Sequence, residues 1–184
     1  MAVGPQASSQ GKQKKSNPEP MNLEPVNGYK TGLLKMTKVG IIGAGLCDPK
    51  LSALAEEVGR RVAEHKAILY CGGLGGVMEA SAKGAVEAGG ITVGILPGVK
   101  TTDANPYIQI PVVTGMGHAR NVILVRSCDV LIAISGSHGT LSEIALALKM
   151  WKPVVGLKTW KHLSDVHYVK SAKEAVEKAF ALLP

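Results

Sequence analysis

The chain has 184 residues, of which 46% are hydrophobic and 22 are glycines, and this composition predicts one α/β domain with a full core plus an extension. No stretch approaches the roughly 18 apolar residues of a membrane span, no signal peptide opens the chain, and the three cysteines form no C-x-x-C pair, so we expect a soluble cytoplasmic protein without a disulfide framework or metal site. The formal net charge is +7, but no cluster of basic and aromatic residues accompanies it, which argues against a nucleic-acid partner.

Residues 1–37 differ in composition from the rest of the chain. They are rich in Ser, Gln, Lys, Pro and Asn and show no apolar periodicity, and the first 38 residues contain six lysines against two glutamates. Such a segment cannot bury enough apolar surface to offset the entropy of ordering. We therefore predict a disordered basic tail over residues 1–37 and a folded domain over residues 38–184.

The folded part opens with a strand, a glycine loop and a helix. The apolar run Val39–Ala44 predicts a buried strand that leads into Gly43-Ala44-Gly45. Asp48 followed by Pro49 is typical of an N-cap and a first helical residue, and apolar residues recur at helical spacing down to His65.

The same order is then repeated. Ile68–Cys71 predicts a second strand, Gly72–Gly76 a second glycine loop, Val77–Ala88 a helix and Ile91–Leu96 a third strand. Small residues line one face of this helix and suit close packing on a sheet; they are Ala80, Gly84 and Ala88.

The second half of the chain continues the alternation. The predicted strands are Ile108–Val112, Val130–Ile134, Pro153–Leu157 and a short edge strand Asp165–Val169. The predicted helices are one that carries Arg120, one from Thr140 to about Met150, and a closing amphipathic helix from Ala172 to Leu183. A third glycine loop, Ser135–Gly139, leads into the helix of Thr140.

Strands that alternate with helices and are apolar throughout indicate a parallel sheet covered on both faces. We therefore predict a single Rossmann-like, doubly wound α/β domain with a mainly parallel sheet. In such sheets ligands bind beyond the carboxyl ends of the strands, and all three glycine loops fall at that edge.

The glycine loops predict an anion site. Bare backbone N–H groups and the positive end of a helix dipole favour phosphate, so we expect a small phosphorylated ligand. His138 can donate to such a group, although an exposed loop histidine is more often incidental. The predicted phosphate-binding residues are Gly43, Gly45, Gly72, Gly73, Gly75, Gly76, Gly136, Ser137, His138, Gly139 and Thr140.

Two common nucleotide motifs are excluded. The first loop begins like a dinucleotide fingerprint, but its last glycine is missing and no acidic residue follows the second strand to hold a ribose, which argues against NAD and FAD. No G-K-[ST] follows a glycine loop, which argues against a Walker-type site. Glu79 most simply complements a helix dipole, and Trp151 and Trp160 are interpreted as core or interface residues.

Arg120 and Glu143 are the predicted catalytic residues, and each also has an ordinary structural explanation. Thr140 and Glu143 fit a capping box, with Thr140 as N-cap and Glu143 reaching back to its N–H. Arg120 lies in an otherwise apolar neighbourhood but also fits a solvated helix charge. The residues alone leave these alternatives open.

Three motifs together resemble one family. They are G-G-x-x-G-V-M-E-A-x-x-x-G-A-x-E-A-G-G from Gly72 to Gly90, A-R-N at Ala119–Asn121, and G-x-x-G-T-x-x-E from Gly136 to Glu143. The set is similar to the LOG-type Rossmann family, whose members long carried a lysine decarboxylase label. Thr114–Asn121 and Lys152-Pro153-Val154 look like a smaller branch that includes the molybdenum cofactor carrier proteins and is related to the DprA/Smf fold.

The resemblance implies two alternative functions. The first is a binding or carrier protein for a phosphate-bearing, nucleotide-like ligand, either a molybdopterin-type cofactor or a nucleoside monophosphate, with no further cofactor required. The second is a phosphoribohydrolase that cleaves the N-glycosidic bond of nucleoside 5′-monophosphates, with Glu143 stabilising the oxocarbenium-like state and Arg120 orienting the substrate.

Two further expectations follow from the resemblance. The hydrolases carry P-G-G-x-G-T-x-x-E, whereas this chain has Ser135 and Ser137 in place of the proline and second glycine, which favours the carrier. Relatives are dimers or tetramers, so we expect a homo-oligomer whose interface contains the helices of Arg120 and Thr140. No plausible pyridoxal-phosphate lysine supports the decarboxylase label.

Overall fold

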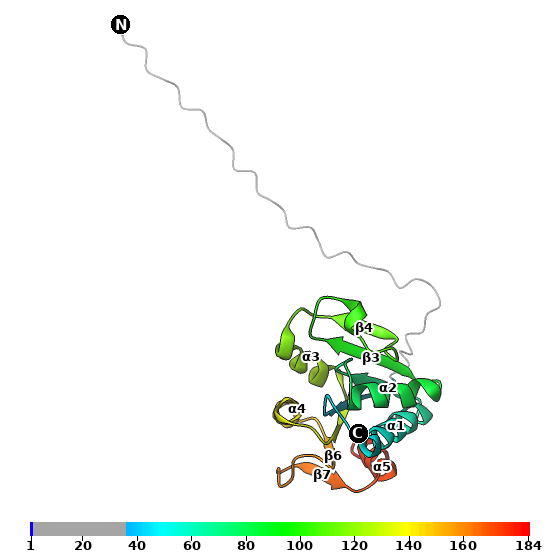
Figure 1. Cartoon of the computed structure of the whole chain (residues 1–184). Coiled ribbons are helices and arrows are strands. Elements are labelled where there is room, and N and C mark those ends of the chain that lie inside the picture. Colours follow the sequence, from blue (N-terminus) through cyan, green and yellow to red (C-terminus); the bar gives the residue numbers. More distant parts are fainter. Residues whose placement is uncertain (2–35) are drawn as a thin grey trace, which may run out of the picture. The chain divides into compact units, whose positions relative to one another are not determined.

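The structure is a computed structural model that describes Met1 and residues 36–184 (Figure 1). The predicted basic tail over residues 1–37 lies outside these residues, apart from Met1, Met36 and Thr37. The elements below all belong to the described part of the chain.

Strands and helices alternate as the sequence predicts. The strands are β1 (Lys38–Gly43), β2 (Ile68–Cys71), β3 (Ile91–Leu96), β4 (Ile110–Val113), β5 (Val130–Ile134), β6 (Val154–Leu157) and β7 (Val166–Val169). The α-helices are α1 (Pro49–Glu64), α2 (Val77–Glu87), α3 (Arg120–Ser127), α4 (His138–Lys149) and α5 (Ala172–Ala181). None of the helices described is both long and apolar enough to cross a membrane.

The strands form one parallel sheet in the order β4-β3-β2-β1-β5-β6-β7. The chain builds outwards from β1 to β4, returns through α3, and builds outwards again on the other side of β1. The strand order therefore reverses between β1 and β5, where Gly43 is paired with Ile134 at the carboxyl edge. This arrangement confirms the predicted doubly wound fold, and such folds bind ligands at this switch point.

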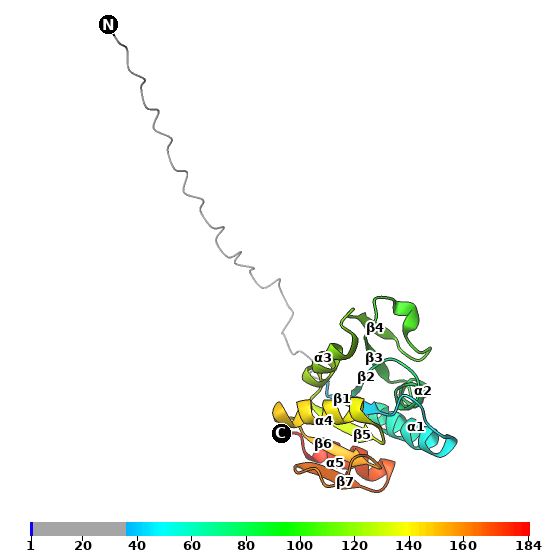
Figure 2. The ribbon, with the colours of Figure 1, turned by 60° about the vertical axis from the view of Figure 1, so that its left-hand side comes forward.

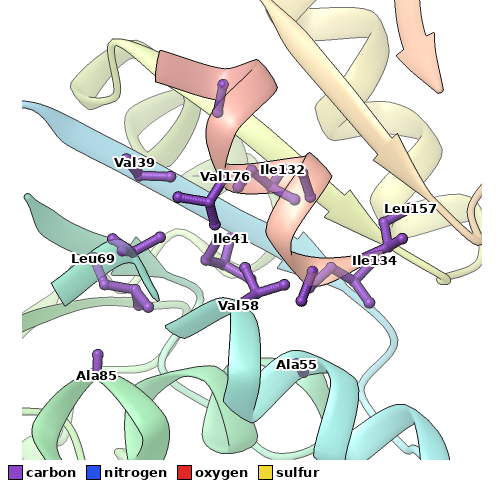
Figure 3. Packing of buried hydrophobic residues seen from close by; sticks show 14 of the residues in the cluster. Val39, Ile41, Ala55, Val58, Leu69, Ala85, Ile132, Ile134, Leu157 and Val176 are labelled. Atoms are coloured by element: carbon purple, nitrogen blue, oxygen red, sulfur yellow. The ribbon is translucent and has the colours of Figure 1, made fainter. Parts of the chain in front are cut away.

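Helices cover both faces of the sheet (Figures 1 and 2). α1, α2 and α5 pack on one face, where Ile41, Ile132 and Val176 belong to a buried cluster (Figure 3). α3 and α4 pack on the other face, where Leu124 and Ile144 join a second cluster. Because both faces are covered, all five residues of β5 are buried.

α1 and α2 approach so closely that their backbones touch. A Cβ at Gly59 would collide with the carbonyl oxygen of Ser81, and a Cβ at Gly84 with that of Glu56. The prediction that the small face of α2 packs on the sheet is therefore wrong for Gly84, which faces α1. Both helices lie on the same face of neighbouring strands, and only glycine permits this approach between them.

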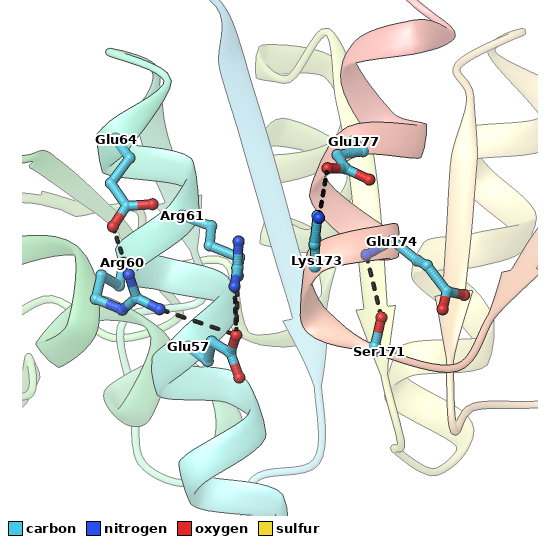
Figure 4. Close-up of polar contacts among 8 residues, drawn as sticks. All are labelled: Glu57, Arg60, Arg61, Glu64, Ser171, Lys173, Glu174 and Glu177. Carbon is cyan, nitrogen blue, oxygen red and sulfur yellow. Dashed lines mark hydrogen bonds and ion pairs between the residues drawn. The ribbon is translucent and has the colours of Figure 1, made fainter.

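Local signals set the ends of two helices. Asp48 accepts a hydrogen bond from the N–H of Leu51 at 2.7 Å, as predicted for the N-cap of α1. Ser171 accepts one from Glu174 at 3.2 Å at the start of α5 (Figure 4). The exposed face of α1 carries ion pairs among Glu57, Arg60, Arg61 and Glu64 (Figure 4).

β4 begins at Ile110, two residues after the predicted start. Before Ile110, the backbone of the chain bonds to the side chain of Thr92 instead of to the backbone of β3. The hydroxyl of Thr92 donates to the carbonyl of Tyr107 at 2.6 Å and accepts from the N–H of Gln109 at 3.0 Å. Regular pairing with β3 begins only after these side-chain bonds.

Candidate functional site

The loops after β1, β2 and β5 lie next to one another at the carboxyl edge, because these strands are neighbours in the sheet. The first two loops touch, since Val77 donates its N–H to the carbonyl of Ala44 at 2.9 Å. Gly76, the N-cap of α2, has a φ of 66°, and a Cβ there would collide with the same carbonyl. Only glycine fits this position.

Asn105 holds the second glycine loop in place. Its backbone N–H donates to the carbonyl of Gly73 at 2.9 Å, and its side-chain amide donates to that of Leu74 at 2.8 Å. Asn105 is buried, although it lies between Leu96 and Ile108, where the sequence predicts neither a helix nor a strand. Its role depends on contacts distant in sequence, so no local pattern indicates it.

α4 begins at His138, two residues before the predicted start, and its N-cap is Ser137, whose side chain makes no capping bond. Gly136 has a φ of 104°, and a Cβ there would collide with the side chain of Thr140, which is buried beneath the loop. The predicted capping box is therefore wrong, because Thr140 lies inside the helix and Glu143 one turn further on. Capping does not explain Glu143.

Glu143 instead faces Arg120. The turn Gly117–Ala119 leads directly into α3, whose first residue is Arg120. Nη1 of Arg120 lies 3.5 Å from Oε1 of Glu143, and each side chain is only 9% exposed. Arg120 is therefore a buried, paired charge, and its alternative interpretation as a solvated helix charge is wrong.

Gly72 makes room for the guanidinium group. A Cβ at Gly72 would collide with Nη2 of Arg120 and lie 2.7 Å from Sδ of Met78. Nε of Arg120 is buried, and no partner for it lies among the described residues. Buried N–H groups are nearly always bonded, so this donor indicates a place for an acceptor.

Burial also changes the acidity of the site. It raises the pKa of Glu143 to about 7, which the positive charge of Arg120 only partly opposes. Burial lowers the pKa of Arg120, against the attraction of Glu143. The same cause raises the pKa of Cys71 to about 11, so this neighbouring thiol stays protonated and is a poor nucleophile.

Polar contacts join α3 to the start of α4. The side-chain amide of Asn121 donates to the hydroxyl of Ser142 at 3.4 Å, and that hydroxyl donates to the carbonyl of Gly139 at 2.7 Å. These residues fix the third glycine loop relative to the helix of Arg120. No sequence pattern indicates this role for Ser142, and Asn121 carries a signal only as part of the A-R-N motif.

A segment after β6 holds the outer side of the third glycine loop. The hydroxyl of Thr159 donates to the carbonyl of Ser135 at 2.6 Å, and Nε1 of Trp160 donates to that of Ser137 at 3.1 Å. The indole ring also lies beside His138, with ring centroids 5.9 Å apart. Two carbonyl groups of the loop are thus bonded to this segment, which fixes the outer side of the loop.

The helices that follow the three glycine loops differ in charge at their N-termini. Asp48 caps α1, and Glu79 lies in the first turn of α2. The first turn of α4 has no acidic residue and no side-chain cap. Of the three, α4 therefore offers the most favourable place for a phosphate group.

Two cavities lie away from the Arg120–Glu143 pair. One of about 360 Å³ adjoins Gly76 and Glu79, next to the first two loops. A larger one of about 870 Å³ lies at the amino edge of the sheet and includes Trp151 and Pro153. No group of three potential metal-ligating side chains was found in residues 36–184.

Comparison with known proteins places the chain among cofactor-binding relatives. A family model described as the SLOG cluster4 family matches residues 36–181. The molybdenum cofactor binding protein of Rippkaea orientalis is 36% identical, with 81% of this chain and 98% of that chain covered and a TM-score of 0.77. The Moco carrier protein of Chlamydomonas reinhardtii is 38% identical, with 81% and 100% covered and a TM-score of 0.72.

Other relatives have different or unassigned roles. An uncharacterised protein of Archaeoglobus fulgidus is 48% identical over 143 residues, which is 78% of this chain and 94% of that protein. A cytokinin riboside 5′-monophosphate phosphoribohydrolase of Rhodococcoides fascians is 30% identical over 119 residues, 62% of this chain and 54% of the enzyme. DprA of Streptococcus pneumoniae, at 18% identity and a TM-score of 0.64, shares the fold alone.

Proposed function

The chain belongs to the SLOG cluster4 family, and from that premise we propose that it is a binding or carrier protein for a phosphate-bearing, nucleotide-like ligand. The ligand is a molybdopterin-type cofactor or a nucleoside monophosphate. The names of the Rippkaea orientalis and Chlamydomonas reinhardtii relatives support the first of these.

The uncapped N-terminus of α4 next to the buried guanidinium of Arg120 carries the proposal. The first N–H groups of α4 bind the phosphate, and Arg120 adds a charge-assisted bond from its Nε, which has no partner among residues 36–184. Gly136 and Thr140 hold the loop in the required shape, since the side chain of Thr140 fills the space beneath Gly136.

Binding alone needs no further chemistry, and two features favour it. Ser137 carries a side chain at a position where the hydrolase motif has glycine, so the loop departs from the hydrolase pattern. Glu143 is paired with Arg120, and this ion pair gives the carboxylate a role in orienting the guanidinium group that needs no catalytic step.

Phosphoribohydrolase activity is the alternative function, and the acidity of Glu143 favours it. A carboxyl with a pKa of about 7 is suited to exchanging a proton at neutral pH, and its ionised form stabilises an oxocarbenium-like state. The enzyme of Rhodococcoides fascians, by its name, acts on a nucleoside monophosphate of this kind.

Two measurements on the same preparation separate these functions. Native mass spectrometry detects a ligand that co-purifies with the protein, and incubation with a panel of nucleoside 5′-monophosphates tests for release of ribose 5-phosphate. A bound ligand without turnover supports the carrier and excludes the hydrolase. Release that disappears in Glu143→Gln, and persists in the exposed variant Glu177→Gln, contradicts a pure carrier.

A further inference from the structure

The cavity of about 360 Å³ lies between the first halves of α1 and α2 and opens beside the first two glycine loops. Leu46, Cys47 and Gly76 form its border with those loops. Its polar lining consists of Ser52, Glu56, Glu79, Lys83 and Tyr107. Small-molecule sites have volumes of roughly 300–1,000 Å³ and combine apolar with a few polar side chains. The volume and the lining of this cavity fit that description.

The charges in this cavity are not equivalent. Nζ of Lys83 lies 3.1 Å from Glu56 and 3.8 Å from Glu87, so the lysine is engaged by its neighbours. Glu79 makes no ion pair or side-chain hydrogen bond with the described residues. Its Oε2 lies 3.7 Å from the position that a Cβ would take at Gly75, so the carboxylate faces the glycine loop.

A carboxylate in this place repels phosphate and attracts hydrogen-bond donors. The phosphate is therefore favoured at α4, whose first turn has no acidic residue, and disfavoured at α2. The glycine loop before α4 follows β5, and the glycine loop before α2 follows β2. Only β1 lies between these two strands in the sheet. Two strand spacings are about 10 Å, a distance that a nucleotide bridges between its phosphate and its ring.

We propose that Glu79 is a specificity-determining residue that accepts hydrogen bonds from two adjacent N–H groups on the ligand's ring. This inference rests on the proposed function and adds the ligand's orientation and ring class to it. The two oxygens of a carboxylate match a pair of neighbouring donors, such as the ring N–H and amino group of guanine or of a pterin. Hypoxanthine lacks the amino group and offers one donor fewer.

GMP and IMP test this inference, because they differ only in that amino group. Affinities for GMP, IMP and ribose 5-phosphate are measured by calorimetry on the wild type, Glu79→Gln and Glu177→Gln. Glu177 is an exposed residue of α5, so its variant controls for the change in net charge. If the protein cleaves the nucleotides, the same ratios are taken from kcat/KM.

The wild type is expected to prefer GMP over IMP by about tenfold or more, as a charge-assisted hydrogen bond allows. Glu79→Gln should reduce this ratio to about one-third or less while the affinity for ribose 5-phosphate stays within about twofold, and Glu177→Gln should keep the wild-type ratio. A residue that only complements the helix dipole would lower the melting temperature of Glu79→Gln and leave the ratio unchanged, which would overturn the inference.

Two failures are distinguishable. Tight binding of ribose 5-phosphate with equal affinities for GMP and IMP overturns the role of Glu79 and leaves the proposed function intact. Absence of binding for all three compounds overturns the proposed binding of a nucleoside monophosphate, and the inference with it.

Discussion

The ion pair between Arg120 and Glu143 is long, at 3.5 Å, and both side chains are almost completely removed from water. Under these conditions the cost of desolvation exceeds the attraction between the charges, which is why the pKa of Glu143 rises to about 7. A pair of this kind adds little to stability. Its presence is better explained by the orientation of the guanidinium group toward a ligand.

The stability of Glu143→Gln relative to the wild type should rise with pH. A carboxyl whose pKa is raised on folding contributes stability that is complete below its unfolded value near 4.5 and is lost as the pH rises through about 7. Glutamine resembles the protonated acid, so the two proteins should be similar at pH 5, and the variant should gain up to about 3 kcal/mol by pH 8.

Denaturant unfolding of both proteins at several pH values measures this difference, with Glu177→Gln as an exposed control that should show no such trend. A wild type that becomes the more stable protein at pH 8 would mean that the attraction of Arg120 exceeds the cost of burial.

Arg120→Lys should weaken the binding of phosphate-bearing ligands by about tenfold or more, since lysine cannot reproduce the fork of guanidinium donors. Arg126→Lys is a matched control, because Arg126 lies on the same helix and is exposed. Calorimetry with ribose 5-phosphate, which contains no ring, isolates the phosphate contacts. Equal losses in both variants would show that the effect is not specific to the position of Arg120.

At the scale of elements, β2, β3 and β5 were predicted to the residue, because short apolar runs between glycines or polar residues define buried strands. The start of α4 was not, since Thr140 and Glu143 satisfy a capping pattern that the chain does not use. The side chain of Thr140 is buried under Gly136 instead. Tertiary packing of Thr140, rather than the local capping pattern, therefore determines where α4 begins.

The residues at the candidate site differ in the signal that they leave in the sequence. Arg120 and Glu143 lie in motifs, and Arg120 is an unusual charge in an apolar neighbourhood. Asn105, Thr159 and Trp160 were not assigned to the glycine loops, because each acts through a hydrogen bond to a carbonyl more than 20 residues away in sequence. Backbone carbonyls leave no signature in a sequence.

Trp160→Phe should weaken the binding of ribose 5-phosphate by about three- to tenfold, the equivalent of one neutral hydrogen bond. The change removes the donor to the carbonyl of Ser137 and keeps an aromatic ring beside His138. The carbonyl of Ser137 keeps its bond from the N–H of Leu141 at 3.0 Å, so the change loosens the outer side of the loop and leaves the first turn of α4 in place. Unchanged affinity would show that the loop keeps its shape without this bond.

Fluorescence gives an independent measurement at the same place. Trp151 is 94% exposed and lies at the opposite edge of the sheet, so Trp151→Phe leaves Trp160 as the reporter for the loop. This variant should bind like the wild type, and its emission should change when ribose 5-phosphate is added. A silent signal at saturating ligand would argue against contact between the loop and the phosphate.

At the scale of the whole molecule, apolar residues remain exposed on one side of the domain. Ile110, Val112, Met116 and Val122 have exposed fractions between 38% and 49%. Ile110 and Val112 pair with Val93 and Ile95, which belong to the cluster under α3, so they lie on the same face of the sheet as Val122. β4 and α3 also lie near each other in both views (Figures 1 and 2).

A second copy of the chain is the partner that we propose for this apolar patch of β4 and α3. β4 is one of the two edge strands of the sheet, and an uncovered apolar edge strand favours association. Covering the patch also places the interface on the helix that begins with Arg120, so assembly and ligand binding share one element. The expected state is a dimer or tetramer.

Light scattering coupled to size exclusion tests this assembly on the full chain. The wild type should elute as an oligomer, and Val122→Lys, which places a charge in the centre of the proposed contact, should shift the protein to a monomer with the same circular dichroism spectrum. Lys173→Glu on the opposite face changes charge without touching the patch and should leave the oligomer intact. A monomeric wild type at micromolar concentration would exclude the interface, and an oligomeric Val122→Lys would place it elsewhere.

If the monomeric variant also binds ribose 5-phosphate more weakly, then the interface supports the position of Arg120, because Val122 and Arg120 lie within one turn of the same helix.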